Sequence, residues 1–288
     1  MKYRFIERNQ RRFPIQRLCW LLGLQRSSYY AWQKRRPSQQ EQNNRALIEH
    51  IRRIHRLSRR TYGSPRVYAQ LQRQGITCSP KRVARLMQQD GLQGQRRSRR
   101  VITTHSRHSL PVAPNSLNRE FYADRPDQKW VADITYIPTA EGWLYLAGVL
   151  DLYSRKIVGW AMSHQIDANL VEQALRMALY QRRPGRGLLH HSDRGSQYAS
   201  RQIRTLLEVH QIQISMSGTG NCYDNAVMES FWGTLKNEWV HRQKYQTRAQ
   251  AKSDIFAYIE GFYNTVRLHS TLGYCSPMEF EAKYNQSP

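Results

Sequence analysis

The sequence predicts an α/β protein in which a mixed five-stranded sheet with helices follows small all-α units of the helix-turn-helix kind. Apolar residues make up 40% of the 288 residues, enough to form a sizeable core. Their spacing is helical through most of the first hundred residues and becomes strand-like from Gln128. Residues 1–119 hold 27 Lys or Arg against 4 Asp or Glu, whereas residues 120–288 hold 18 against 17. The two halves are therefore chemically different.

Composition and charge exclude several classes of protein. No apolar run reaches the length of a membrane span, and the polar start does not resemble a signal peptide. The four scattered cysteines form no C-x-x-C pair, which argues against a disulfide scaffold or a cysteine-rich zinc site and favours the cytoplasm. The formal net charge is +24, of which +23 lies in residues 1–119, so we expect that half to bind DNA.

The first helical region is a short N-terminal unit, residues 1–36. Residues 13–34 read as two short helices. Pro14 can open the first, Gly23 ends it, and Ser27 can cap the second.

A second helical region, residues 44–92, is predicted to be a helix-turn-helix-like DNA-binding domain. Ser64-Pro65 and Ser79-Pro80 each supply a cap followed by proline at the first helical position. The second of these helices presents Lys81, Arg82 and Arg85 as candidate DNA contacts. A plain three-helix bundle with a solvated cationic face has the same spacing and stays open as an alternative. Residues 93–124, which include RRSRR at 96–100, read as a basic linker.

The remaining chain, residues 125–288, reads as a sheet domain with a C-terminal helical segment. Its predicted order is three strands, helix, strand, helix, strand, helix and helix. The predicted strands are 128–138, 144–153, 156–162, 187–192 and 212–215, and the predicted helices are 167–178, 200–209, 224–239 and 249–263.

Three carboxylates lie where these elements can bring them together. Asp133 lies inside the first strand, where a charge is costly unless it is paired or binds a metal. Asp193 ends the fourth strand, and Glu229 lies on a later helix, off its apolar stripe and in line with Asn225 and Lys236. Singly, each could be only a cap or a surface charge. Together they suit phosphoryl transfer, in which hard oxygen ligands hold two Mg²⁺ about 4 Å apart.

Four segments carry a family resemblance. QKWVADITYIP, HSDRGSQY, DNAVMESFWGTLKNE and YNTVRLHSTLGYCSP, in this order, resemble the DDE catalytic core of bacterial insertion-sequence transposases in the retroviral-integrase superfamily. The most similar group makes its transposase from two overlapping reading frames, and the chain resembles the second-frame (OrfB-like) product. The resemblance extends from the R-x-Y-G-S-P-R segment to the C-terminal region.

The resemblance implies a ribonuclease-H-like fold and metal-dependent cleavage and transfer of DNA strands at insertion-sequence ends. The D, D(35)E triad of the family falls on Asp133, Asp193 and Glu229, which would be both catalytic residues and metal ligands, with Mg²⁺ or Mn²⁺ as cofactor. A cation seven residues past the Glu falls on Lys236, which with Asn225 we expect to contact DNA. A homo-oligomer on transposon-end and target DNA is expected in the bacterial cytoplasm, close to the nucleoid. The upstream-frame protein or its fusion is a further candidate partner.

Other readings remain. The chain could be a non-catalytic DNA-binding regulator that kept the fold, or a nuclease acting on hybrids or junctions. A tyrosine recombinase would need a clustered Arg-His-Arg set, of which Arg267-Leu268-His269 is only a fragment. No sustained heptad repeat is present, so we expect that full activity can require fusion to an upstream segment.

Overall fold

The computed structural model describes residues 1–95, 111–218 and 222–286, which fold as two compact units, 1–53 and 54–288. The RRSRR segment of the predicted linker, at 96–100, lies outside the described residues. The domain boundaries given above remain predictions. The unit boundary itself falls within one long helix, α4 (Gln39–Leu57).

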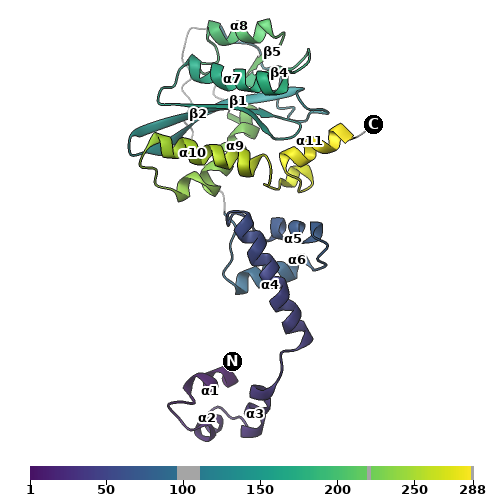
Figure 1. The fold of residues 1–288 in the computed structure, drawn as a ribbon, viewed down its shortest axis with the longest axis vertical. Helices are drawn as coiled ribbons and strands as arrows, with labels where there is room; N and C mark the ends of the chain where they lie inside the picture. Colours follow the sequence, from purple (N-terminus) through teal and green to yellow (C-terminus); the bar gives the residue numbers. More distant parts are fainter. Residues whose placement is uncertain (96–110, 219–221, 287–288) are drawn as a thin grey trace. The chain divides into compact units, whose positions relative to one another are not determined.

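The first unit begins with three short helices, α1 (Lys2–Asn9), α2 (Ile15–Leu21) and α3 (Arg26–Lys34), at the purple end of the chain in Figure 1. Ile6, Leu18, Cys19 and Tyr29 form their small core. The prediction of two helices within residues 13–34 is confirmed. The predicted cap is wrong, because Gln25 precedes α3 and Ser27 lies inside its first turn.

The second unit begins with the end of α4 and continues through α5 (Ser64–Arg73) and α6 (Pro80–Gln89). Ser79 caps α6 as predicted, since its hydroxyl accepts a hydrogen bond from the Arg82 amide. Ser64 is not the cap of α5, because Gly63 occupies that position and makes no side-chain cap bond.

The sheet has five strands in the order β3-β2-β1-β4-β5. β1 pairs antiparallel with β2 and parallel with β4; β3 is antiparallel to β2, and β5 is parallel to β4. This arrangement confirms the mixed sheet and the ribonuclease-H-like fold. The strands are β1 (Lys129–Thr139), β2 (Gly142–Asp151), β3 (Ile157–Ser163), β4 (Leu189–Ser192) and β5 (Gln213–Met216).

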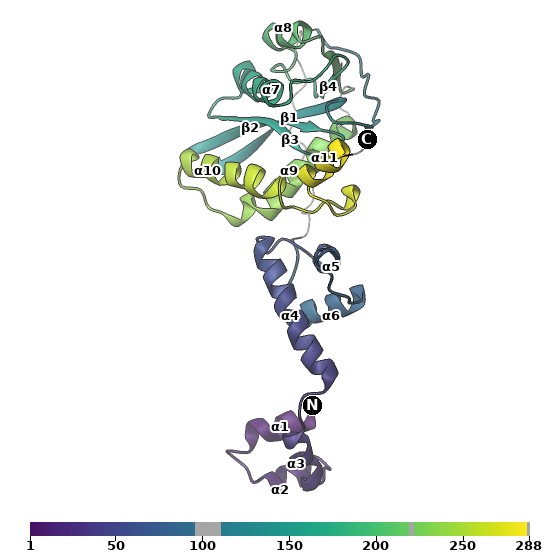
Figure 2. The same ribbon diagram turned by 45° about the vertical axis from the view of Figure 1, so that its right-hand side comes forward.

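Helices cover both faces of the sheet. α7 (Ala168–Arg182) and α8 (Arg201–Val209) lie on one face, and α9 (Ala226–Glu238) and α10 (Arg248–Tyr258) lie on the other (Figures 1 and 2). The predicted helix starting at Asp167 is confirmed, since its carboxylate accepts a bond from the Leu170 amide. A large apolar core fills the space between the sheet and α7 and α8. Short 3₁₀ turns lie at Cys222–Asn225, before α9, and at Val240–Arg242 and Ser270–Leu272. A π-turn (Ile259–Tyr263) follows α10, and α11 (Pro277–Gln286) is the last described helix.

The turn before α5 and the first turn of α5 are joined to the C-terminal segment of the sheet domain. The Tyr62 hydroxyl donates to the Val266 carbonyl at 3.2 Å and accepts from the Leu268 amide at 2.7 Å. Arg66 Nε donates to the Leu268 carbonyl at 3.0 Å, and its guanidinium lies 3.6 Å from Glu238 at the end of α9. The helix-turn-helix-like helices are therefore attached to the element that carries Glu229.

None of the helices in the described ranges combines the length and the apolar character needed to cross a bilayer.

Candidate active site

Asp133 lies in the middle of β1, directly opposite Gly148 on β2. One carboxylate oxygen accepts a hydrogen bond from the Ile134 amide at 2.8 Å, and the other accepts from the indole Nε1 of Trp232 at 3.1 Å. Trp232 belongs to α9, three residues after Glu229. The Trp232–Asp133 bond therefore ties the helix that carries one candidate carboxylate to the strand that carries another.

Two further features hold α9 against the sheet. The Asn225 side chain, buried at the start of the helix, donates to the carbonyl of Ala132 at 3.0 Å. A Cβ at Gly148 would lie 2.7 Å from Met228 Cε and 2.9 Å from the Trp232 ring. A larger residue there would displace the Met228 and Trp232 side chains, so glycine leaves room for the ring that bonds to Asp133. The position of Glu229 thus depends on contacts made by its neighbours on the same helix.

Asp193 follows the last residue of β4, which is parallel to β1 and adjacent to it. Its carboxylate accepts a hydrogen bond from the Gly195 amide at 2.9 Å, which fixes the turn where the chain leaves the sheet. Behind it, His191 lies between two serine hydroxyls of the β5 region, 2.8 Å from Ser215 and 3.1 Å from Ser217. Burial lowers the pKa of His191 to about 4, so this histidine is neutral at pH 7.

The three carboxylates are close enough to affect one another. Burial raises the pKa of Asp133 well above its usual range, and the negative charges of Asp193 and Glu229 raise it further, against the opposing hydrogen bonds from Ile134 and Trp232. A strand centre, a strand end and a helix thus bring three acidic groups into one electrostatic environment.

Lys236, two turns beyond Glu229 on α9, lies beside the same site. Burial lowers the pKa of its ammonium group, while the charge of Asp133 acts in the opposite direction. Tyr136 and Tyr198 also border the carboxylates. Burial raises the pKa of both phenols, and the charges of Asp133 and Asp193 raise it further, for Tyr136 after the effect of Tyr145. The site is therefore acidic at its centre, with a cation and aromatic side chains around it.

The donor set fits a hard divalent cation in kind, because carboxylate oxygens are the ligands that Mg²⁺ prefers. In the parts of the chain that the structure describes, no three Asp, Glu, His or Cys side chains are drawn together closely enough to hold a metal ion. Like charges resist such an approach unless a cation lies between them. The chemical identity of the residues thus supports a metal site. The described side chains by themselves are not close enough together to coordinate the ion.

The predicted DNA-contact residues lie in different settings. Lys81 and Arg85 are exposed on α6, and Arg82 beside them is half-buried, while Val83 and Met87 on the opposite side of the helix are buried. Asn225 is buried and bonds to the sheet, which suits a role in placing α9. The DNA contacts of all five candidates, Lys236 included, stay predictions.

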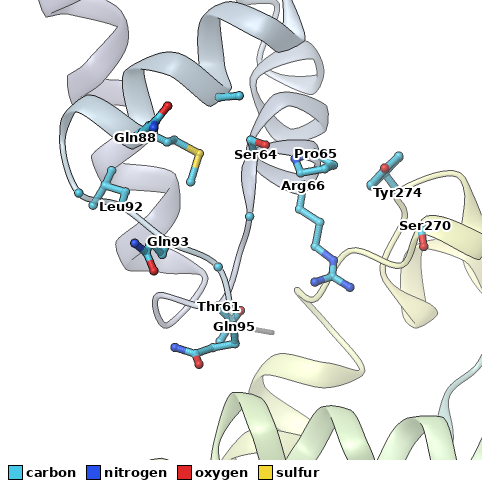
Figure 3. A pocket seen from close by; sticks show the side chains of 15 residues that line it. Thr61, Ser64, Pro65, Arg66, Gln88, Leu92, Gln93, Gln95, Ser270 and Tyr274 are labelled. Atoms are coloured by element: carbon cyan, nitrogen blue, oxygen red, sulfur yellow. The ribbon is translucent and has the colours of Figure 1, made fainter. Parts of the chain in front are cut away.

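A hollow of about 1150 Å³ lies away from the carboxylates, between α5, α6 and the C-terminal segment (Figure 3). Gly63, Gly94, Ser270 and Tyr274 are among the residues that line it, and no carboxylate of the triad does. Two backbone segments that line it, at Gly63 and Gly94, lie very close together, since a Cβ at Gly94 would lie 2.5 Å from the Gly63 amide nitrogen. The hollow belongs to the junction of the helical region with the catalytic domain.

Family comparisons match the chain in three segments. An integrase core domain matches residues 123–222, a further integrase core domain matches 210–277, and an HTH-like domain matches 41–100. These matches confirm the integrase-type core and the helix-turn-helix-like region that the sequence predicts. They define the class as proteins that combine an integrase core domain with an HTH-like domain.

Curated relatives give the particular family. The chain is 46% identical over 269 residues to the insertion element IS600 uncharacterized 31 kDa protein of Shigella sonnei, covering 93% of this chain and 99% of that protein. It is 41% identical over 285 residues to the transposase InsF for insertion sequence IS3A of Escherichia coli, covering 98% and 99%. The chain belongs to the IS3 family of insertion-sequence transposases.

Solved structures give weaker likenesses. A simian T-cell lymphotropic virus intasome matches with 13% identity and a TM-score of 0.49, over 83% of this chain and 75% of that one. The HTLV-2 integrase catalytic core, solved with magnesium, matches with 13% identity and a TM-score of 0.45, over 56% and 99%.

Sequence reasoning missed the residues that position the triad. Trp232 and Gly148 gave no signal, because a Trp beside an apolar stripe and a Gly inside a strand are ordinary until the helix is seen to lie on that strand. Tyr198 lies in HSDRGSQY, but its proximity to Asp133 required the parallel pairing of β1 with β4.

Proposed function

We propose that this chain catalyses metal-dependent cleavage and transfer of DNA strands at insertion-sequence ends, with Asp133, Asp193 and Glu229 as its catalytic carboxylates and metal ligands. The observation that carries the proposal is the shared electrostatic environment of these three residues, seen in the raised pKa of Asp133. A buried carboxylate whose pKa is raised by burial and by neighbouring negative charges is typical of a functional site, because structure alone gains nothing from such an arrangement.

Each residue of the site has a distinct role in this proposal. The three carboxylates hold the divalent cations, expected to be two Mg²⁺, for which Mn²⁺ can substitute. When bound, such ions activate the attacking oxygen and stabilise the leaving oxygen. Trp232 and the Ile134 amide fix the orientation of Asp133, and the Gly195 amide fixes that of Asp193. Lys236, next to these carboxylates, binds a DNA phosphate. Its positive charge reduces the repulsion between the carboxylates and the DNA backbone.

The partners follow from the chemistry. Two DNA ends must meet for transposition, so we expect a homo-oligomer on transposon-end and target DNA. The helix-turn-helix-like region, attached to the C-terminal segment through Tyr62 and Arg66, would bring end DNA to the catalytic domain. The upstream-frame protein or its fusion remains a candidate partner, and the bacterial cytoplasm is the expected compartment.

Asp193→Asn tests the proposal, because it removes a negative ligand and keeps the size of the side chain. We expect strand transfer of a precut, radiolabelled element end in Mg²⁺ to fall by about a thousandfold or more, since the site loses a charged ligand for the cations on which the reaction depends. Binding to the same end DNA should change little. Chelation of divalent cations should abolish the wild-type reaction.

Asp167→Asn is the matched control. It makes the same chemical change at the cap of α7, where asparagine also accepts the bond from Leu170, so we expect full activity. Equal strand transfer by wild type and Asp193→Asn would contradict the catalytic role. If neither shows activity while both bind DNA, the same assay on the chain fused to its upstream segment decides between a missing segment and a non-catalytic regulator.

A further inference from the structure

The turn between α2 and α3 has the length and the ending that are typical of a helix-turn-helix. Four residues, 22–25, connect α2 to α3, which is the usual length for this motif. Gly23 has φ +64°. Its amide bonds to the Trp20 carbonyl at 3.1 Å, and the Leu24 amide bonds to the Cys19 carbonyl at 2.9 Å. This pair of bonds is a Schellman ending, which turns the chain sharply out of α2 and into α3.

The same ending occurs in the region that matches the HTH-like domain. Gly75 follows α5 with φ +73°, its amide bonds to Gln72, and the Ile76 amide bonds to Leu71 at 3.0 Å. The connection from α5 to α6 is longer, residues 74–79, than the one from α2 to α3. Residues 1–36, which lie outside all three family matches, therefore contain the more typical turn of the two.

A small core holds α3 so that one face points outward. Tyr29 is buried against Ile6, Leu18 and Cys19, and Trp32, three residues later on the same face, stacks on Tyr3 with ring centroids 5.5 Å apart. The opposite face of α3 carries Ser27, Tyr30, Ala31 and Lys34, all exposed. Small, hydroxyl-bearing and cationic side chains along one exposed helix face are what contact with base edges and phosphates requires.

Charge gives an independent indication of the ligand. Residues 1–36 contain ten Lys or Arg and one acidic residue, Glu7. The side chains of all ten cations are exposed to solvent. A unit of this size with a formal charge of +9 strongly attracts a polyanion.

We propose that residues 2–34 form a second DNA-binding module, in which α3 enters the major groove of duplex DNA and presents Ser27, Tyr30 and Lys34 to it. The chain would then hold DNA at two separate helix-turn-helix units, α2–α3 and α5–α6. This inference concerns binding, so it stands or falls separately from the chemistry proposed for the carboxylates.

The test uses the full-length chain with two substitutions on α3, Tyr30→Ala and Lys34→Ala. Its matched control is Phe5→Ala with Arg8→Ala on α1, which likewise removes one exposed aromatic ring and one exposed cation. Thermal melting of each variant checks that the unit is folded. The probes are a labelled duplex carrying the element's own end and an unrelated duplex of equal length, studied by binding titration and hydroxyl-radical footprinting.

We expect the α3 variant to lose affinity for the end duplex on the order of tenfold and to lose one part of the footprint. The α1 variant should keep the whole footprint and lose no more than about threefold in affinity. Substituting Lys81 and Arg85 on α6 should remove a different part of the footprint.

An unchanged footprint for the folded α3 variant, or equal losses for the α3 and α1 variants, would overturn the proposal. So would a change in oligomeric state with DNA binding intact, because that would make α3 a protein-binding surface. Strand transfer of a precut end at saturating DNA by wild type but not by Asp193→Asn would leave the catalytic proposal standing in each case.

Discussion

The cations of residues 1–36 and two arginines of the catalytic domain, Arg267 and Arg182, occupy opposite environments. In residues 1–36 every Lys and Arg is exposed to solvent. In the catalytic domain Arg267 is only 4% exposed, and two of its nitrogens bond to Glu238 at 2.7 and 2.6 Å. Arg182 is likewise half enclosed between Asp127 and Glu281. The same side chain is therefore a solvated surface charge in one region and a partner in buried ion pairs in the other.

The Arg267–Glu238 pair shows what a buried charge does in this fold. Glu238 ends α9 and also accepts from the Tyr258 hydroxyl at 2.9 Å, so α9, α10 and the C-terminal segment meet at one carboxylate. Its attraction holds the pKa of Arg267 above the ordinary value, although burial opposes this. The cluster fixes the far end of the helix that carries Glu229 and Lys236.

The largest stability change should come from breaking this pair. Arg267→Ala leaves Glu238 buried without its main cation, so we expect the free energy of unfolding to fall by about 3–5 kcal/mol. Arg73→Ala, in the helical half, breaks an exposed ion pair with Glu279 and should cost no more than about 1 kcal/mol. Urea unfolding at pH 7 measures both. Equal losses would contradict the contrast between the two regions.

A buried carboxylate should give the next effect, through pH. Asp151 is fully buried at the end of β2, and burial raises its pKa from 3.8 to about 6, although the Ser154 amide and hydroxyl and the Asp127 amide donate to it. The folded state then binds the proton more tightly than the unfolded state. This contribution to stability is therefore complete below pH 3.8 and is lost as the pH rises to about 6.

The expected size is about 3 kcal/mol, the free energy of the full pKa shift. Asp151→Asn removes the titrating group and keeps its shape. Urea titration from pH 4 to 7 measures the unfolding free energy of both proteins. As the pH rises, the wild type should lose stability relative to this variant. A difference that does not change over this range would show that Asp151 titrates normally in the folded protein.

The smallest expected effect concerns exposed cations. Arg85→Ala on α6 should leave the unfolding free energy within about 0.5 kcal/mol of wild type and lower the slope of log affinity against log salt for duplex DNA by about one. Arg176→Ala, an exposed cation on α7 paired with Glu172, is the control and should leave the slope unchanged. If both variants lower the slope equally, DNA binding is not confined to the basic half.

Local signals predicted much of the fold. The spacing of apolar residues gave the five strands and their order along the chain, and short-range chemistry gave the caps at Ser79 and Asp167. The predicted caps at Ser27 and Ser64 are wrong, because serine is also tolerated inside a first helical turn. Gln25, two residues before Ser27, and Gly63, directly before Ser64, take the cap positions instead. Helix ends depend on which neighbouring residue leaves the helical conformation, and several choices there differ little in energy.

The sequence by itself determined the charge division, the carboxylates Asp133, Asp193 and Glu229 as candidates, and the family. These are properties of residue type and order, which are present before any folding. Tertiary structure alone decided that Trp232 and Asn225 hold α9 on β1, that Gly148 makes room for it, and that Arg66, Arg267 and Glu238 join the helical region to the same helix. Such contacts join residues distant in the chain, and burial gives them strength that no local pattern records.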